Sequence, residues 1–328
     1  MSFDQKILVI RFSSIGDIIL ATSPLKTIRK TFPDAQINFL TLDNFAPLLE
    51  FHPDIDRLIP FSKNMSGLDL WGIADYIRKQ KYSTIFDLHN SLRSNIITFR
   101  TTSPVLQLKK PRWKRFMLFQ FHQNEFAEYF STLKMYHEHL GDIWKVGDTI
   151  PGTSLIVTDH EKAKATELVN INDFITIIPG AAWGQKQWSA KKYIEFIQTV
   201  EKPVVLLGAK KDKICFKIAE KVPSVLNLAG KTSLRQAMAV LSNSFHVVGS
   251  DTGLTHAAEA LGISVTMILG PTSPETGAGV HLDKSTNLET ELWCRPCSQN
   301  GKLPCYQKTQ VCMDSISVPD VIETMPMG

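Results

Sequence analysis

The sequence of 328 residues contains no long hydrophobic run. No stretch approaches the roughly 18 consecutive apolar residues of a membrane-spanning helix, so we expect any membrane contact to be peripheral. The first apolar run, Ile7 to Ile10, ends at Arg11. It is too short for the core of a signal peptide and is typical of a first β-strand. These absences predict a cytoplasmic protein.

Proline, glycine and cysteine are also scarce. With 17 Pro, 18 Gly and 43% hydrophobic residues, the composition is that of a globular protein and excludes a low-complexity or disordered chain. The chain is longer than a domain with a single hydrophobic core usually is, which predicts two domains. Four of the five cysteines lie between residues 294 and 312. In a reducing cytosol, such a cluster indicates a metal site or free thiols before it indicates disulfides.

Acidic residues are absent between Leu88 and Asn124, whereas this stretch holds seven basic residues: Arg93, Arg100, Lys109, Lys110, Arg112, Lys114 and Arg115. The net charge of the whole chain is only +4, so the positive charge is local. A patch of this kind attracts phosphates, carboxylates, nucleic acid or an anionic membrane face. A solvated surface without a partner is the alternative interpretation.

Two series of short apolar segments alternate with helical patterns, which predicts an α/β fold with two parallel, doubly wound sheets. The predicted strands are Ile7–Phe12, Ile37–Thr41, Arg57–Pro60 and Thr84–Leu88, then Phe174–Ile178, Val204–Leu207, Val225–Leu228, His246–Val248 and Val265–Leu269. A Pro-Gly-Thr interruption near residue 152 predicts domains 1–155 and 156–328. The last helical segment, Val318–Met325, is expected to pack back onto the first domain.

The first predicted strand runs into the loop Phe12-Ser-Ser-Ile-Gly-Asp17, and a helix is predicted from Gly16 to Arg29. Ligands of open α/β sheets bind at the carboxyl ends of the strands, so this loop is expected to line a site. Its single glycine does not match the G-x-G-x-x-G pattern of dinucleotide-binding proteins. Asp17 fits two roles, a first-turn acid that stabilises the helix dipole or a general base.

Two further strand ends have the features of a phosphate site. Ile178 is followed by a loop of small residues that carries Lys186, and small residues let backbone N–H groups approach an anion. An ordinary surface lysine is the alternative. Val248 is followed by Gly-Ser-Asp-Thr-Gly and a new helix, where Ser250, Thr252 and free helix N–H groups suit a diphosphate.

Together these segments resemble glycosyltransferase family 9, the ADP-heptose:lipopolysaccharide heptosyltransferases. The blocks that carry the resemblance are RFSSIGDIILATSPLKTIRKTFPDAQI, DLHNSLRS, GAAWGQKQW and GSDTGLTHAAEALG with its downstream GPTSPE, and they span nearly the whole chain. The resemblance implies a GT-B fold, in which two Rossmann-like domains face a central cleft. It further implies inverting transfer of a heptose from a nucleotide-sugar donor to a lipopolysaccharide core or another anionic, lipid-linked glycan.

The resemblance also implies roles for single residues. Asp17 would be the catalytic base and Lys186 would contact the donor phosphates. The remaining implied donor residues are Ser250, Asp251, Thr252, Gly253, His256, Gly180 and Lys210. The implied acceptor residues are Ser14, Gly16, Arg93, Lys110, Arg112 and Arg115. Two departures leave the nucleotide open: alanines replace hydroxyl residues at 181 and 182, and Lys210 stands where an acidic ribose contact is expected.

A catalytic metal is not expected. The only D-x-D spelling considered, Asp54-Ile55-Asp56, precedes a predicted strand and is typical of a turn. Lys186 and a helix N-terminus would instead hold the phosphates. The pattern C-x2-C-x7-C-x6-C, formed by Cys294, Cys297, Cys305 and Cys312, predicts a structural zinc or iron site, with four reduced thiols as the alternative.

Two other functions compete with glycosyl transfer. A sugar-nucleotide 2-epimerase would share the two-domain architecture. A non-enzymatic anion- or nucleic-acid-binding module would use the basic run and the cysteine cluster. We expect the transferase, with no nucleic-acid partner, located in the cytoplasm or peripherally on the cytoplasmic face of the inner membrane.

Overall fold

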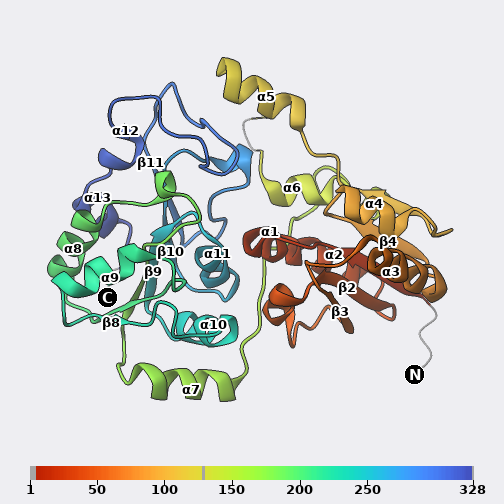
Figure 1. The fold of residues 1–328 in the computed structure, drawn as a ribbon, viewed down its shortest axis with the longest axis horizontal. Helices are drawn as coiled ribbons and strands as arrows, with labels where there is room; N and C mark the ends of the chain where they lie inside the picture. Colours follow the sequence, from red (N-terminus) through yellow and green to blue (C-terminus); the bar gives the residue numbers. More distant parts are fainter. Residues whose placement is uncertain (1–4, 128–129, 327–328) are drawn as a thin grey trace. The chain divides into compact units, whose positions relative to one another are not determined.

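The computed structural model describes residues 5–127 and 130–326. The chain divides into two compact units, Met1–Lys110 with Thr132–Ile156, and Pro111–Ser131 with Val157–Gly328 (Figure 1). The last change of unit, between Ile156 and Val157, falls beside the predicted boundary at residue 155. Residues 111–131, expected in the first domain, group instead with the second unit, where Arg115 and Asn124 bond Glu275.

The sheet of the first unit has five parallel strands in the order β3-β2-β1-β4-β5. Their bounds are β1 Lys6–Ile10, β2 Gln36–Leu42, β3 Arg57–Phe61, β4 Thr84–Asp87 and β5 Val105–Gln107. Strand β1 is central, and Ile7 lies opposite Ile37 on one side and Thr84 on the other. Residues Ile7 to Ile10 are buried, which is why this strand is a continuous apolar run and does not alternate.

The helices of the first unit are α1 Ile15–Leu20, α2 Thr22–Thr31, α3 Gly67–Gln80, α4 Leu92–Thr98 and α6 Thr132–His137, with short 3₁₀ turns η1 Asp43–Leu49 and η2 Gly141–Ile143. The predicted single helix from Gly16 to Arg29 is therefore two helices. The Thr22 hydroxyl donates a hydrogen bond to the carbonyl of Ile19 (2.6 Å) and accepts one from the backbone amide of Ser154 (3.0 Å). Side-chain bonds of this kind compete with the regular helix ladder.

The sheet of the second unit has six parallel strands in the order β11-β10-β9-β6-β7-β8. Their bounds are β6 Ile175–Ile178, β7 Val204–Leu206, β8 Leu226–Asn227, β9 His246–Ser250, β10 Val265–Leu269 and β11 Thr286–Glu289. Trp188, Tyr193 and Phe196 are fully buried against the strands of this sheet and form the bulk of its core.

The helices of the second unit are α5 Arg112–Phe121, α7 Asp159–Val169, α8 Ala190–Thr199, α9 Lys213–Lys221, α10 Leu234–Ser242, α11 Gly253–Ala260, α12 Val311–Asp314 and α13 Val318–Glu323, with 3₁₀ turns η3 Gly184–Lys186 and η4 Pro274–Thr276. Helix α13 packs on α8. Its residues Val318 and Val321 lie in the core of the second unit. The expectation that this segment packs on the first domain is therefore wrong. No described helix is long and apolar enough to cross a membrane.

The two sheets share one strand order. Counted from the first strand of each unit, both have the order 3-2-1-4-5, and the second unit adds a sixth strand beside the fifth. This is the order of dinucleotide-binding folds, in which ligands bind where the chain reverses direction across the sheet. The reversal lies between β1 and β4 in the first unit and between β6 and β9 in the second. The predicted site loops follow these strands.

Candidate functional sites at the two strand-order reversals

Asp17 lies in the first turn of α1, directly after β1. Its Oδ2 accepts the backbone N–H (2.9 Å) and the hydroxyl (2.8 Å) of Ser14, the residue that caps the helix. The helix-capping role considered from the sequence is therefore present. The Asp17 side chain is nevertheless 38% exposed, so it remains accessible to another molecule.

A second contact sets Asp17 apart from an ordinary capping acid. Arg11, at the end of β1, places its guanidinium 2.6 Å from Asp17 Oδ1. The Arg11 side chain is buried and also donates to the carbonyls of Leu88 (2.6 Å) and Ser13 (3.0 Å). Sequence analysis did not single out Arg11. The signal in the sequence that could have identified Arg11 is a charged residue at the end of a buried strand, next to a predicted site loop.

The carboxyl group of Asp17 is held in its charged form. Burial on its own raises the pKa of Asp17. The Arg11 charge and the Ser14 hydrogen bonds lower it by a larger amount, so the pKa lies below its ordinary value. Burial lowers the pKa of Arg11, but the charge and hydrogen bond of Asp17, together with Tyr136 and Asp87, outweigh burial and raise it. An ionised carboxylate at neutral pH is what a general base requires.

The other side of the reversal, at the end of β4, carries further polar groups. Asp87 is fully buried and accepts the backbone N–H groups of His89 (3.0 Å) and Asn90 (2.8 Å). The pKa of His89 is lowered to about 3 by burial and then by the charges of Arg11 and Lys110, so this imidazole is neutral at physiological pH. Lys110 donates to the His89 carbonyl at 2.6 Å.

The predicted acceptor residues fall into both units. Ser14 and Gly16 lie at the start of α1, while Arg93 and Lys110 lie close enough to His89 to lower its pKa. The remaining two, Arg112 and Arg115, lie on helix α5 in the second unit, and Arg115 donates to the carbonyl of Glu275 at 3.1 Å.

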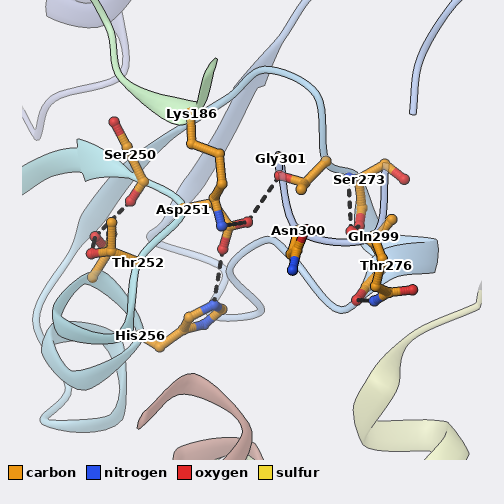
Figure 2. A network of polar contacts seen from close by, with 12 residues as sticks. Lys186, Ser250, Asp251, Thr252, His256, Ser273, Thr276, Gln299, Asn300 and Gly301 are labelled. Carbon is orange, nitrogen blue, oxygen red and sulfur yellow. Dashed lines mark hydrogen bonds and ion pairs between the residues drawn. The ribbon is translucent and has the colours of Figure 1, made fainter. Parts of the chain in front are cut away.

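At the reversal of the second sheet, Lys186, Asp251 and His256 form one cluster (Figure 2). Lys186 and His256 point at the Asp251 carboxylate from opposite sides, with Nζ 2.6 Å from Oδ2 and Nε2 3.4 Å from Oδ1. The Thr272 hydroxyl donates to Oδ2 at 2.9 Å. The structure thus brings together three of the predicted site residues, from η3, the end of β9 and α11.

The electrostatics of this cluster favour an ionised carboxylate. Burial raises the pKa of Asp251, but the Lys186 charge and the His256 hydrogen bond lower it well below the usual range. Thr252 caps α11, whose first helical residue is Gly253. The amide groups at the start of α11 therefore lie next to the cluster, as the sequence predicts, and Ser250 lies fully buried at the end of β9.

A loop that the sequence analysis did not assign covers Lys186. A Cβ added to Gly301 would lie 2.5 Å from Cγ of Lys186, and Gly301 has a φ of +76°, so a larger residue is doubly disfavoured there. The Gly301 amide donates to the buried Ser298 hydroxyl at 2.8 Å. This loop lies between two of the cysteines and fixes the stem of the lysine.

A cavity of about 500 Å³ lies at the ends of β6 and β7 within the second unit. Ala181, Lys211, Asp212 and Lys217 are among its lining residues. Asp212 accepts the Ala209 amide at 2.7 Å, and its carboxyl carbon would be 2.5 Å from a Cβ at Gly180, so the glycine makes room for the acid.

Two details of this cavity differ from the sequence interpretation. Lys210, the predicted donor contact, has an exposed side chain and is not among the residues that line the cavity. An acidic residue, thought to be missing from this loop, is present two positions later as Asp212. Its position after a strand end and before helix α9 was the available signal.

The Asp54-Ile55-Asp56 segment has a structural role, as expected. Asp56 Oδ2 accepts the Ile37 amide at 2.7 Å and forms an ion pair with Arg29 at 2.5 Å, which fixes the turn before β3.

The four clustered cysteines influence one another without forming a ligand set. Burial, and after it the neighbouring Cys312, Cys294 and Cys305, together raise the pKa of Cys297 to about 11. Within residues 5–127 and 130–326, however, no three His, Cys, Asp or Glu side chains are placed to hold one metal ion. All four are free thiols. The predicted zinc or iron site therefore stays a prediction.

Comparison with known proteins places the chain in a family. The chain is 27% identical over 298 residues to lipooligosaccharide heptosyltransferase 2 of Haemophilus influenzae, covering 83% of this chain and 85% of that one. Its fold matches the crystal structure of the Escherichia coli ADP-heptose lipopolysaccharide heptosyltransferase II with a TM-score of 0.75, 22% identity and coverage of 98% and 97%. The chain thus has the GT-B fold, with one Rossmann-like sheet in each unit.

The rival epimerase is a more distant match. A structure that carries the name of a UDP-N-acetylglucosamine 2-epimerase, from Listeria monocytogenes, gives a TM-score of 0.51 at 15% identity and covers 80% of this chain and 78% of that one. The sequence model described as glycosyltransferase family 9 (heptosyltransferase) matches residues 71–306. The chain belongs to glycosyltransferase family 9 and is a glycosyltransferase of the heptosyltransferase type.

Proposed function

We propose that this enzyme transfers a heptose from a nucleotide diphosphate donor to the lipopolysaccharide core or a similar anionic, lipid-linked glycan, with inversion at the anomeric carbon. The observation that carries the proposal is the cluster of Lys186, Asp251 and His256 at the N-terminus of α11. A lysine ammonium and free helix amides form a diphosphate site. The names of the relatives support the sugar and the acceptor.

The donor binds to the second unit. Its nucleoside occupies the cavity at the ends of β6 and β7, where Asp212 can accept hydrogen bonds from ribose hydroxyls and thereby supply the acidic contact expected of the family. Its diphosphate lies against Lys186 and the amide groups of Gly253 and its neighbours. The lysines that border the cavity, Lys211 and Lys217, add attraction for the anionic donor.

Lys186 exchanges partners when the donor binds. Before binding, Asp251 neutralises its charge at 2.6 Å. A diphosphate that takes over Lys186 leaves Asp251 with His256 and Thr272 as its partners. As the bond to the sugar breaks, negative charge grows on the leaving diphosphate, and Lys186 stabilises this charge.

Asp17 acts on the acceptor. Its lowered pKa keeps it ionised, and Oδ1 or Oδ2 takes the proton of the acceptor hydroxyl as that oxygen attacks the anomeric carbon. The face opposite the nucleotide is attacked, so the configuration inverts. Acceptor phosphates and carboxylates bind Arg93, Lys110, Arg112 and Arg115, with Ser14 and Gly16 beside Asp17.

Catalysis needs no metal in this proposal, because Lys186 and the helix amides carry out the charge neutralisation that a divalent ion performs elsewhere. Activity is therefore expected to survive EDTA. The enzyme works in the cytoplasm, at the cytoplasmic face of the inner membrane where the acceptor lipid is anchored, and has no nucleic-acid partner.

A structural zinc or iron on Cys294, Cys297, Cys305 and Cys312 remains our expectation, supported by the C-x2-C-x7-C-x6-C spacing and by the other three cysteines lying near Cys297. Elemental analysis of protein purified without chelators should find about one metal per chain. The double variant Cys294→Ser with Cys297→Ser should lose the metal and lower the unfolding temperature more than donor affinity. Cys215→Ala, outside the cluster, should keep the metal. Protein without metal would contradict this prediction.

The decisive experiment incubates the enzyme with ADP-heptose and a deacylated, water-soluble core glycan. Mass spectrometry should find the glycan heavier by one heptose, and NMR should find the inverted anomer. An epimerase would change the donor sugar when acceptor is omitted, and a binding module would change neither substrate.

A thermal-shift comparison of ADP-, GDP- and UDP-sugars then identifies the nucleotide, since a ligand at about 100 times its Kd stabilises a protein by roughly 2.7 kcal/mol.

A further inference from the structure

Helix α5 carries a stripe of exposed aromatic side chains. Trp113, Phe116 and Phe121 are 67%, 47% and 58% exposed. Their rings contact one another, with centroids 5.6 Å apart for the first pair and 5.9 Å for the second. Large apolar side chains gathered on one exposed helix face are uncommon on a monomeric surface and indicate an interaction site.

The aromatic surface continues beyond the helix. His122, which caps α5, contacts the ring of Trp293 at 5.1 Å, and Trp293 contacts Tyr306 at 6.1 Å. Trp293 and Tyr306 are 68% and 57% exposed. Tryptophan and tyrosine are the side chains enriched at the boundary between lipid headgroups and acyl chains, because each combines an apolar ring with a polar atom.

Positive charge accompanies the rings. Arg112 and Lys114 are exposed on the same helix, and the chain contains no acidic residue from Leu88 to Asn124. The helix is also fixed in place, because Leu118 is buried and Glu275 accepts hydrogen bonds from Arg115 and, at 2.9 Å, from Asn124. A fixed helix with an apolar face and basic flanks matches the signature of a segment that lies in the surface of an anionic bilayer.

The ring geometry favours lipid over nucleic acid. Trp113 and Phe116 are stacked at an interplanar angle of 29°, so each covers a face of the other. Aromatic side chains that bind single-stranded nucleic acid instead offer their faces to the bases. A compact cluster of rings inserts between lipid headgroups without needing free faces.

We propose that α5, with Trp293 and Tyr306, docks the enzyme on an anionic lipid bilayer, the rings at the headgroup boundary and Arg112 and Lys114 against lipid phosphates. This inference deepens the proposed function, since a lipid-linked acceptor is anchored in such a surface. It assigns the contact to particular side chains and gives the aromatic residues a role in membrane docking alone, whereas Arg112 serves both docking and acceptor binding.

The test is co-sedimentation of the full chain with vesicles of phosphatidylethanolamine and phosphatidylglycerol, compared with phosphatidylcholine vesicles. Wild-type protein should bind the anionic vesicles, and raising the salt from 0.1 to about 0.5 M should release part of it, because screening weakens the charge attraction. The double variant Trp113→Ala with Phe116→Ala should bind at least about tenfold more weakly, since it removes the inserted apolar area.

Phe216→Ala is the matched control, because Phe216 is an exposed aromatic residue (45%) that lies between Lys213 and Lys217 on α9. This variant should bind vesicles as the wild type does. Far-ultraviolet circular dichroism and unfolding temperature should show that both variants are folded. Equal vesicle binding by the wild type and the α5 variant, or an equal loss in the Phe216 variant, would overturn the proposal. Competition by single-stranded RNA for the same rings, without vesicle binding, would overturn it in favour of nucleic acid.

Activity measurements separate this inference from the proposed function. On a water-soluble, deacylated acceptor the α5 variant should keep its turnover, whereas on acceptor embedded in vesicles its rate should fall in parallel with binding. Wild-type protein that transfers heptose in solution but ignores vesicles would refute the docking surface and leave the function. Vesicle binding that depends on the rings, without heptose transfer, would support the surface and refute the function.

Discussion

At the scale of single residues, the contact between Arg11 and Asp17 decides how strong a base the carboxylate is. A guanidinium 2.6 Å away lowers the pKa of Asp17, which keeps it ionised but also makes it a weaker proton acceptor. The same contact, together with Ser14, fixes the orientation of the carboxylate. Arg11 is thus a positioning residue, whose effect on catalysis passes through Asp17.

We predict that Arg11→Met raises the pKa of Asp17, because the charge that lowers it is gone while burial remains. In kcat/KM measured against pH on a soluble acceptor, the acidic limb should move to higher pH. The rate on the plateau should fall about tenfold or more as the carboxylate loses its fixed orientation. Arg11→Lys, which keeps the charge, should return the limb toward the wild-type position. An acidic limb that stays in place in Arg11→Met would contradict the role.

Three candidate residues proposed from the sequence share one property, which is that they lie in segments that follow a buried strand. Asp17, Lys186 and Asp251 were found in this way because chain order fixes which strand ends carry polar side chains. Asp212 and Gly301 were not found. Their roles depend on packing between segments far apart in the sequence, Asp212 against Gly180 and Gly301 against Lys186, and no local pattern records such a contact.

At the scale of elements, strands with a continuous apolar run were predicted within about two residues, as for β6 and β10. The edge strands β5 and β11 were missed because they are only partly buried and short, so their hydrophobic signal is weak. The break between α1 and α2 was missed as well, since it involves a long-range hydrogen bond from the Ser154 amide to the Thr22 hydroxyl.

Helix α7 offers a test of how an ion pair holds one helix against another. Glu161 in its first turn accepts two bonds from Thr158, and it pairs with Arg235 of α10, whose Nε lies 2.7 Å from Oε1. The bond from Arg235 and those from Thr158 outweigh burial and lower the pKa of Glu161 from 4.5 to about 2. We predict that Glu161→Gln lowers the free energy of unfolding by about 1 to 2 kcal/mol at pH 7.

The pH dependence follows from the sign of this shift. A carboxyl group whose pKa is lowered on folding stabilises the native state fully above its unfolded value, near 4.5, and this contribution is lost as the pH falls toward 2. In urea unfolding, the difference between the wild type and Glu161→Gln should therefore shrink from pH 4.5 downward and vanish below pH 2, where the carboxyl group is protonated in both states. A difference that persists well below pH 2 would assign the effect to packing.

At the scale of the whole molecule, two sheets with one strand order carry different chemistry at the same topological position. The reversal in the first unit holds a carboxylate paired with a buried arginine, Asp17 with Arg11. The reversal in the second unit holds a lysine paired with a buried carboxylate, Lys186 with Asp251. The first arrangement leaves an exposed base and the second an anion site, so a substitution in each unit should affect a different step.

We predict that Asp17→Asn and Lys186→Ala separate kinetically. Asp17→Asn keeps the shape but removes proton acceptance, so turnover should fall roughly 10²- to 10⁴-fold while donor affinity changes little. Lys186→Ala should weaken donor binding as well as turnover, because its charge acts on the bound diphosphate and increasingly on the leaving group. Calorimetry of donor binding, with turnover at saturating acceptor, measures both.

The chain supplies a matched control for each substitution. Asp69 in α3 accepts the same two bonds from its capping serine, Ser66, as Asp17 does from Ser14, but forms no ion pair with an arginine within the described residues. If Asp17 were only a helix cap, Asp17→Asn and Asp69→Asn would leave turnover equally high. Lys164→Ala removes an exposed positive charge from α7 and should leave donor affinity unchanged. Donor affinity that is also unchanged in Lys186→Ala would mean that the diphosphate binds elsewhere.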